Sequence, residues 1–422
     1  MAKQTGAKST GGGKLSNGVG NLNRYKEKEI KKHLAKRQSF LLLGPRQTGK
    51  TTLCEQALRN QPNKIEYWLS DPTVRLELEK DPGSIIRRIE DAKSKKIVFI
   101  DEAQKVPEIF DSAQYLIDKN LASFIFTGSS ARKLRRGGAN LLPGRIRKIS
   151  LDPLSFGEIG LLGQSRIKDL AVDNINSAGY TLNDYLVYGS LPRIVMSNKS
   201  DRVDLLSAYT EIYLEEEIRA EALSRKIGAF GRFLELAAAE SGNNPNLTKL
   251  SNSVGISSPA IKEFYNILED TLIVDRIDPY IINARKRIVS NPRYYFFDLG
   301  VRNILSRLTL DNNLVNAQKG ILFEHAVIQE ILRRIRILNK NYKVYYWRTY
   351  YGVEVDCIID TGAKIIPIEI KAHNRIGKKD ISGLISFMDE HKEKAKQGYI
   401  ITMGKYNEKI TDNITAVPWF NI

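Results

Sequence analysis

The chain has few of the features that place a protein in a membrane or in an oxidising compartment. No run among its 422 residues approaches the ~20 apolar residues that span a bilayer. Its first residues are polar and lack the apolar stretch of a secretory signal. Its 2 cysteines, Cys54 and Cys357, lie far apart and have apolar neighbours. We therefore expect a cytosolic (cytoplasmic) protein with reduced, buried thiols and no membrane partner.

Acidic residues are scarce relative to basic ones. Lys and Arg number 65 against 48 Asp and Glu, a formal net charge of +17. The excess is concentrated in residues 1–37 and in 132–148, and the second segment has no acidic residue. Such a balance favours a polyanion as partner, with nucleic acid, and DNA in particular, as the main expectation. A generally basic composition is the alternative explanation. The length predicts several domains.

Residues 1–23 consist largely of Gly, Ser, Lys and Asn and cannot fold alone. The motifs KQT at Lys3–Thr5 and AKSTGG at Ala7–Gly12 resemble the N-terminal tail of a core histone of the H-three type. The resemblance implies a mimic whose Lys8 is modified by host lysine methyltransferases, in which case the protein is host-directed or nuclear. Ala7 replaces the arginine of that tail, and a chance match in a low-complexity segment is the alternative.

A phosphate-binding motif, GPRQTGKT, occupies Gly44–Thr51. It follows the apolar run SFLLL and precedes the helical pattern LCEQALRN, which is the context that G-x-x-x-x-G-K-[ST] requires. The two glycines let backbone N–H groups point at phosphate oxygens beside a helix N-terminus, the lysine neutralises the β and γ phosphates, and the final hydroxyl completes a Mg²⁺ shell. We therefore expect ATP and Mg²⁺ here, held by Gly44, Pro45, Arg46, Gln47, Thr48, Gly49, Lys50, Thr51 and Thr52.

Two further apolar runs end in polar residues. Lys95–Pro107 reads as a strand ending in Asp101 and Glu102, which would hold Mg²⁺ through water and polarise the attacking water. Ser123–Ser130 would place Thr127 or Ser129 near the γ-phosphate, and Lys64–Ser70 supplies another strand. Alternating strands and helices predict an α/β fold, a parallel sheet with helices on both faces.

Together with LPGRIRKISLDPLSFGEI and YGSLPRIV, these motifs resemble the AAA-type ATPases of archaea and bacteria that carry a restriction-endonuclease-like C-terminal domain. The resemblance covers nearly everything after residue 24 and implies a P-loop AAA-type domain over residues 24–200. It also implies that Arg145 contacts nucleotide, in cis or across a subunit boundary of a homo-oligomer. A salt bridge or a phosphate-backbone contact is the alternative for Arg145.

Residues 201–300 read as two modules. Residues 201–244 are helical, include the acidic stretch EIYLEEEIRAE and indicate an arm or lid. Residues 245–300 read as a winged helix, with a turn at Gly255 between two helices and then two strands. Duplex binding and internal packing both remain open for this module. The basic residues expected at the tip of the wing are Arg285, Lys286, Arg287 and Arg293.

Residues 301–422 carry a second set of candidate catalytic residues. A helix over Gly320–Ile335 bears Glu324, and two strands over Lys343–Asp360 are joined at Tyr351–Gly352. Alternate residues of a strand share a face, so Glu369 and Lys371 point together, with Asp356 on the preceding strand. This order resembles the PD-(D/E)xK nuclease fold.

The chemistry of that pattern is metal-dependent phosphodiester cleavage. Asp356 and Glu369 would hold Mg²⁺, Lys371 would orient or deprotonate the nucleophile, and Glu324 would assist. The alternative is a cross-strand ion pair on a fold without activity. We therefore expect an ATP-hydrolysing protein that engages nucleic acid and whose ATP state gates a nuclease-like domain. The alternative is an ATP-driven DNA- or protein-binding switch that does not cleave.

Overall fold

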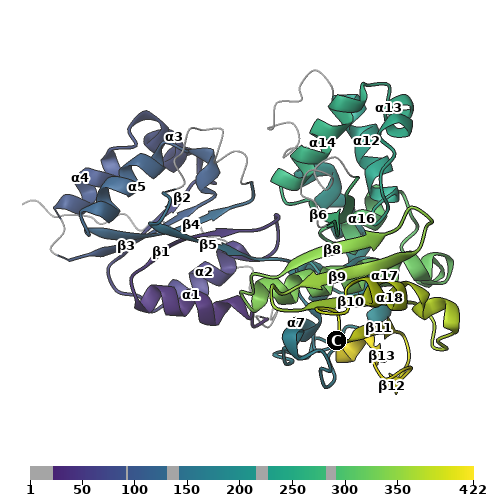
Figure 1. The fold of residues 1–422 in the computed structure, drawn as a ribbon. Coiled ribbons are helices and arrows are strands. Elements are labelled where there is room, and N and C mark those ends of the chain that lie inside the picture. Colours follow the sequence, from purple (N-terminus) through teal and green to yellow (C-terminus); the bar gives the residue numbers. More distant parts are fainter. Residues whose placement is uncertain (1–21, 92–93, 131–141, 215–226, 282–290) are drawn as a thin grey trace, which may run out of the picture.

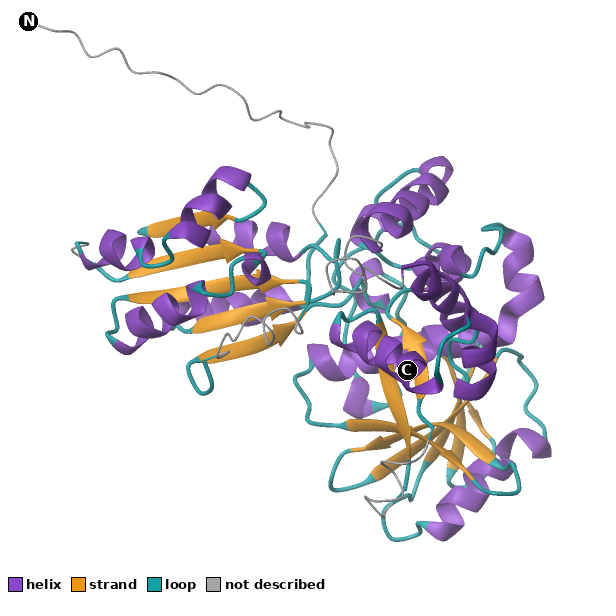
Figure 2. Cartoon of the chain, turned by 90° about the horizontal axis from the view of Figure 1, so that it is seen from above, coloured by secondary structure: helices purple, strands orange, loops and turns teal. Residues whose placement is uncertain are grey.

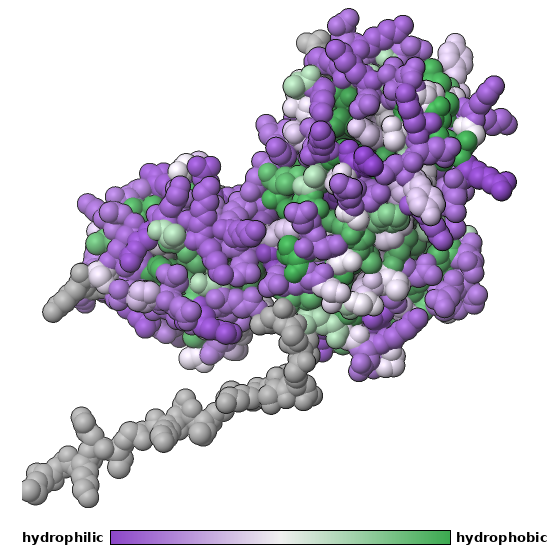
Figure 3. All heavy atoms as spheres, turned by 90° about the horizontal axis from the view of Figure 1, so that it is seen from below, coloured by the Kyte–Doolittle hydropathy of each residue, from purple (hydrophilic) through white to green (hydrophobic). Residues whose placement is uncertain are grey.

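The computed structural model describes residues 22–91, 94–130, 142–214, 227–281 and 291–422. Several predictions lie outside these residues: Lys8 and its tail, most of the acidic stretch, part of the basic segment 132–148, and Arg285, Lys286 and Arg287 of the expected wing. The described chain forms two lobes joined by a narrower waist (Figure 3). No described helix is both long and apolar enough to cross a membrane. Cys54 and Cys357 are buried free thiols.

The first lobe is a five-stranded parallel sheet in the order β2-β3-β4-β1-β5 (Figure 2). All five residues of β1 and all seven of β4 are buried, because helices cover both faces of the sheet. The α/β fold expected from the sequence is therefore confirmed. The strands are β1 (Ser39–Leu43), β2 (Lys64–Trp68), β3 (Lys96–Asp101), β4 (Ala122–Gly128) and β5 (Ile146–Ser150).

Alternation along β1 divides the core of this lobe in two. Phe40 and Leu42 pack with residues of α1 (Lys26–Ala35) and α2 (Lys50–Leu58). Leu41 and Leu43 pack on the other face with residues of α3 (Pro72–Lys80), α4 (Ser84–Glu90) and α5 (Ile109–Asp118). Figure 1 shows these two groups of helices on opposite faces of the sheet. Both faces of the sheet are therefore covered, and the loops that follow the parallel strands β1, β3 and β4 leave the sheet at one end.

The second lobe contains a helical part and an eight-stranded sheet. Its helices are α7 (Phe156–Ile159), α8 (Leu182–Tyr188), α9 (Pro192–Val195), α10 (Arg202–Ala208), α12 (Ile227–Ala239), α13 (Leu247–Val254), α14 (Ser258–Asp270), α16 (Leu299–Leu305), α17 (Asn312–Ile337) and α18 (Lys378–Glu390). Short helical turns are η1 (Ala103–Lys105) in the first lobe, and η2 (Lys168–Leu170), η3 (Lys199–Asp201), η4 (Tyr209–Leu214) and η5 (Trp419–Asn421).

The second sheet has the order β12-β13-β11-β10-β9-β8-β6-β7. Its strands are β6 (Val274–Pro279), β7 (Arg293–Phe296), β8 (Lys343–Arg348), β9 (Glu354–Asp360), β10 (Ile365–Lys371), β11 (Gly398–Thr402), β12 (Glu408–Lys409) and β13 (Ile414–Pro418). β6 pairs in parallel with β8, with Asp278 opposite Tyr345. The expected wing hairpin and the C-terminal strands are therefore one sheet, which crosses the boundary expected at residue 300.

The helix-turn-helix elements form where the sequence places them. α13 ends at Gly255, which has a φ of 79°, and α14 begins three residues later. Ile261, Tyr265 and Leu268 of α14 are buried in the core of the second lobe, as their helical spacing predicts. The hairpin of β6 and β7 follows, and Ile277 and Tyr295 of its strands pack with α17.

Candidate functional site

The phosphate-binding loop joins β1 to α2 with little room for side chains. A Cβ on Gly44 would lie 2.1 Å from the carbonyl oxygen of Leu151, so only glycine fits at that position. Gly49 caps α2 with a φ of 88°, a left-handed conformation that glycine adopts without strain. Backbone geometry therefore explains why both positions of the motif are glycine. The loop leads directly into the N-terminus of α2.

Lys50 lies inside the curve of this loop. Its Nζ donates to the carbonyl oxygens of Gly44 at 3.0 Å and Pro45 at 2.8 Å, and its side chain is buried. The Thr48 hydroxyl also donates to Pro45, at 2.9 Å. The ammonium is thus held where the backbone N–H groups of the loop converge, which is where the phosphates of a nucleotide would lie.

Asp101 and Glu102 lie beside the loop because β3 and β1 run parallel and end at the same edge of the sheet. Asp101 is buried, and its Oδ1 accepts from the hydroxyls of Thr51 at 2.8 Å and Thr127 at 2.7 Å. A hydroxyl next to a carboxylate is an oxygen set that suits Mg²⁺, so these residues fit the expected metal.

Glu102 is held in position by its own backbone and by one neighbour. Its φ is 57°, and its backbone N–H donates to the Thr127 hydroxyl at 2.9 Å. Gln104 Nε2 donates to Glu102 Oε2 at 2.6 Å and to Ser129 Oγ at 3.2 Å. The carboxylate therefore faces the cleft while its orientation is set by a glutamine that sequence reasoning did not single out.

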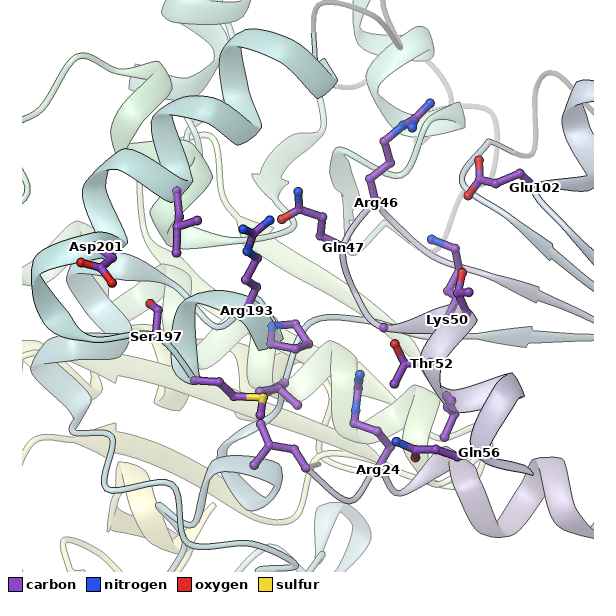
Figure 4. Close-up of a pocket in the computed structure, with 18 residues that line it drawn as sticks. Arg24, Arg46, Gln47, Lys50, Thr52, Gln56, Glu102, Arg193, Ser197 and Asp201 are labelled. Atoms are coloured by element: carbon purple, nitrogen blue, oxygen red, sulfur yellow. The ribbon is translucent and has the colours of Figure 1, made fainter. Parts of the chain in front are cut away.

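A cleft of about 810 Å³ separates the loop from the second lobe. One wall is formed by loop and α2 residues, with Glu102 beside them. The other wall comes from α9 and the segment that follows it. Figure 4 shows Arg193 extending from the second lobe towards the loop at Gln47. The residues of this second wall were not predicted: Pro192, Arg193, Met196, Ser197, Asp201 and Leu205. Only YGSLPRIV, noted for its family resemblance, pointed to this segment.

Arg24 is a further residue of the cleft that sequence reasoning missed. Its guanidinium donates to the Thr48 carbonyl at 2.6 Å, to the Asp152 carbonyl at 2.7 Å and to the Glu158 carboxylate at 2.9 Å. Its side chain is 7% exposed and that of Glu158 is 3% exposed. Arg24 therefore joins the phosphate-binding loop to the segment that enters the second lobe. In the sequence it is one of many basic residues near the N-terminus.

Arg145 does not reach the nucleotide site within one chain. It directly precedes β5, whose first residue pairs with Ser39 at the start of β1, whereas the loop follows the end of β1. That places Arg145 roughly 15 Å from the loop along the strand. Its side chain is exposed and forms a salt bridge with Asp118 at 2.6 Å. The expectation of a contact in cis is therefore wrong; contact across a subunit boundary stays a prediction.

The expected carboxylate set of the C-terminal strands comes together in space. The register of β9 and β10 places Asp356 opposite Glu369, and Asp356 Oδ2 accepts from the Ile370 N–H at 2.8 Å. Lys371 Nζ contacts Glu369 Oε1 at 2.5 Å. Glu324, on α17, accepts from the Tyr295 hydroxyl at 2.8 Å.

Arg293 belongs to this carboxylate set and not to the tip of a wing, which corrects the sequence-based expectation. It lies in β7 with 7% of its side chain exposed, pairs with Glu354 at 3.0 Å and lies 3.8 Å from Glu324 Oε1. Its guanidinium also lies 4.6 Å from the centre of the Tyr346 ring. The β6–β8 pairing explains this, because it turns β7 towards the C-terminal sheet.

The carboxylates of this set hold protons more tightly than free ones. Burial, followed by the charge of Asp356, raises the pKa of Glu324 to about 7 and that of Glu369 to about 8. Burial also raises the pKa of Asp356. Glu369 Oε2 is buried without a hydrogen-bond partner among the described residues, so it is a vacant acceptor. Within the same residues, no group of three or more His, Cys, Asp or Glu could hold a metal ion. Asp356 and Glu369, the expected metal ligands, therefore do not form part of a larger set of such ligands in the described chain.

Comparison with known proteins matches residues 36–160 to an AAA domain, and residues 179–312 and 319–422 to two domains of unknown function, DUF8612 and DUF4143. An uncharacterized protein of Mycobacterium tuberculosis is 23% identical over 396 residues, 92% of this chain and 82% of that protein. One of Haemophilus influenzae is 25% identical over 391 residues, 87% of this chain and 90% of that protein.

Two solved structures are similar at 15% identity. The Walker-type ATPase of Pyrococcus abyssi covers 68% of this chain and 96% of its own, with a TM-score of 0.45. The replication initiator DnaA, bound to AMPPCP and single-stranded DNA, covers 60% and 89%, with a TM-score of 0.30. The loop geometry and the family match agree on the first lobe. Residues 36–160 therefore match an AAA domain and contain a P-loop.

Proposed function

We propose that this protein hydrolyses ATP in the cleft between its lobes and engages nucleic acid, and that its ATP state gates the nuclease-like C-terminal sheet. The observation that carries the proposal is the cleft itself, because its two walls come from different lobes. A nucleotide bound there would contact both walls at once. A ligand that binds one arrangement of the lobes better than another shifts their equilibrium towards it.

The residues of the first wall have distinct roles in this proposal. Lys50 would neutralise the β and γ phosphates, and Glu102 would orient the attacking water and accept its proton. Thr51 and Asp101 would hold Mg²⁺, which when bound supplies positive charge against the phosphate oxygens. On the second wall, Arg193 is the cation that reaches from the other lobe, so it would report the presence of the γ-phosphate to that lobe.

A continuous set of contacts supports the gating. Arg24 bonds to the phosphate-binding loop at Thr48 and to Glu158 of α7. The first residue of α7, Phe156, donates its N–H to Glu330 of α17 at 2.8 Å. Glu330 and its partner Arg334 are both fully buried.

The same helix reaches the carboxylate set. α17 carries Glu324 six residues before Glu330, and near its end Arg336 pairs with Asp152 at 2.7 Å. A shift of the loop would therefore be carried to α17 through packed and paired groups that have little freedom to absorb it. Asp356, Glu369 and Lys371 are the proposed metal-dependent cleavage residues that this shift would reach, and the winged-helix elements are the proposed duplex-binding part.

One observation favours a second candidate function, a switch that binds DNA or protein without cleaving. Two acidic side chains at the C-terminal site are already paired with basic ones, Glu354 with Arg293 and Glu369 with Lys371. Lys371 contacts Glu369, which is one of the two carboxylates expected to hold Mg²⁺, so the ammonium competes with a metal ion for that position.

Two experiments test these proposals. Lys50→Ala should abolish ATP turnover while Lys119→Ala, a change on the same lobe outside the cleft, leaves it intact; persistent turnover in Lys50→Ala would remove the loop from the mechanism. Plasmid nicking with Mg²⁺ or Mn²⁺ should be lost in Lys371→Ala and kept in Lys409→Ala, an exposed lysine of the same sheet. If the wild type does not nick, cleavage is refuted and the switch remains.

A further inference from the structure

Three tyrosines of the second lobe are far more exposed than other large apolar side chains. Tyr350 is 98% exposed, Tyr351 is 91% exposed and Tyr406 is 82% exposed. The next most exposed large apolar side chain in the described part of the chain is Leu76 at 50%. Apart from an edge-to-face contact between Tyr350 and Tyr351, with ring centres 5.7 Å apart, packing within the described chain leaves these rings uncovered. Grouped exposed aromatics mark interaction sites.

The sheet brings these three tyrosines to one edge. β8 ends at Arg348, which pairs with Glu354 at the start of β9. β10 runs antiparallel to β9 and ends at Lys371, which pairs with Thr402 at the end of β11. Tyr350 and Tyr351 follow β8, and Tyr406 follows β11, so both loops leave the sheet at this edge. Figure 1 shows β8, β9, β10 and β11 side by side. At strand spacings of about 4.8 Å, the two loops emerge roughly 10–15 Å apart.

Exposed basic residues surround the rings at the same edge. Arg348 ends β8 and Lys405 precedes Tyr406. The loop after β10 and the start of α18 add Arg375, Lys378 and Lys379, all exposed. α18 is held against this edge because its Gly383 has no room for a Cβ, which would lie 2.1 Å from the Glu354 carbonyl oxygen. We call residues 348–352, 375–379 and 405–406 the tyrosine rim.

The tyrosine rim borders the carboxylate set. Glu369 lies two residues before the end of β10, and Asp356 lies two residues after the start of β9. A strand of nucleic acid lying along the rim would pass within a few residues of these carboxylates. The rim therefore has the composition of a nucleic-acid surface, aromatic rings among cations, and it lies beside the carboxylate set, whose residue pattern resembles that of a nuclease.

We propose that the tyrosine rim binds single-stranded nucleic acid, with unpaired bases stacked on Tyr350, Tyr351 and Tyr406 and with phosphates held by the surrounding Arg and Lys side chains. The inference rests on the proposed engagement of nucleic acid and names the form that is bound. Rings as exposed as these can stack only on base faces that are themselves uncovered, and in a duplex the neighbouring pairs cover them. Stacking on aromatic side chains tolerates any sequence, which suits an edge with few groups able to read bases.

The test is equilibrium binding of the full chain to three labelled probes, measured by fluorescence anisotropy. The probes are an oligothymidylate of about 20 nucleotides, a duplex of the same length, and heparin, which has charge but no bases. The paired change Tyr350→Ala with Tyr351→Ala should weaken oligothymidylate binding by about thirtyfold or more, because it removes two stacking positions. Heparin binding should be unchanged. Tyr406→Ala should weaken oligothymidylate binding less than the paired Ala change does. Replacing Tyr350 and Tyr351 by Phe instead should keep oligothymidylate binding at the wild-type level.

Tyr115→Ala is the matched control, since Tyr115 is an exposed tyrosine of the other lobe. Equal losses on heparin or on the duplex would overturn base stacking, as would unchanged oligothymidylate binding in the paired Ala variant. If the wild type binds none of the probes, the proposed engagement of nucleic acid itself fails. That result is distinct from a wild type that binds and a rim variant that binds equally well.

Discussion

Replacing Arg24 by lysine keeps the charge but should weaken ATP binding strongly. The planar guanidinium reaches three acceptors at once, the carbonyl oxygens of Thr48 and Asp152 and the carboxylate of Glu158. A lysine ammonium is a single point donor and cannot span them. It would stay with Glu158, because an unpaired buried carboxylate is the costliest group to leave behind.

The magnitude follows from the bond that orders the loop. The Thr48 carbonyl would lose a hydrogen bond from a charged donor, which is worth roughly 1.5–3 kcal/mol. This hydrogen bond holds the phosphate-binding loop in its ordered conformation, so losing the bond lowers the affinity for nucleotide by the same free energy. At 1.4 kcal/mol per factor of ten, ATP should bind about tenfold to a hundredfold more weakly.

The assay is titration with a fluorescent ATP analogue in the presence of Mg²⁺, with thermal melting of each variant alongside. Lys31→Ala is the matched control, because Lys31 is a basic residue of α1, the helix that directly follows Arg24, and its side chain is 62% exposed. The Lys31→Ala variant should bind the ATP analogue with the affinity of the wild type. A folded Arg24→Lys protein that binds the analogue within about twofold of the wild type would refute the role assigned to Arg24.

Three further predictions follow from single contacts. Gly44→Ala forces a Cβ against the Leu151 carbonyl, so it should lower the free energy of unfolding by about 1–3 kcal/mol and abolish binding of the ATP analogue. Gly320→Ala is the control, because a Cβ there meets open space, and it should change neither quantity. Normal analogue binding by Gly44→Ala would show that the loop tolerates a side chain at this position. Burial raises the pKa of Glu369 from its ordinary 4.5 to about 8, so its contribution to the free energy of unfolding is complete below about pH 4.5 and is lost as the pH rises through 8. Glu369→Gln should therefore gain melting temperature over the wild type as the pH rises from about 6 to about 9, and a constant difference would refute the raised pKa. Arg293→Met should lower the free energy of unfolding by about 2–3 kcal/mol, which is less than the loss of a fully buried ion pair because its partner Glu354 is 41% exposed. Arg276→Met, at a more exposed ion pair, should lower it by under about 1 kcal/mol. Equal effects of the two changes in urea unfolding would contradict the burial of the Arg293 ion pair.

Local sequence is enough to predict the parts of this protein whose chemistry is local. Gly44, Gly49 and Lys50 are recognisable because the loop, the preceding strand and the following helix are contiguous. Asp101 and Glu102 follow from the apolar run before them, since parallel strands end at one edge. The strands and helices around Asp356 and Glu369 were likewise predicted from alternation and spacing.

Which distant residues complete these sites depends on the long-range fold of the chain. The position of Arg145 depends on the register of β5 against β1, and that of Arg293 on the pairing of β6 with β8. Local periodicity predicts neither register. Alternation along a strand determines which face of the sheet each side chain lies on, but it does not determine which other strand pairs with that strand.

The same reason applies to Arg24 and Arg193 at the cleft and to the tyrosine rim. Tyr350 and Tyr406 are more than fifty residues apart, and each one alone is an ordinary loop tyrosine. They share an edge because β8, β9, β10 and β11 are neighbours whose ends align. Local sequence thus determined the elements and the residues on them, while long-range pairing of strands and packing of the two lobes determined which of those residues act together.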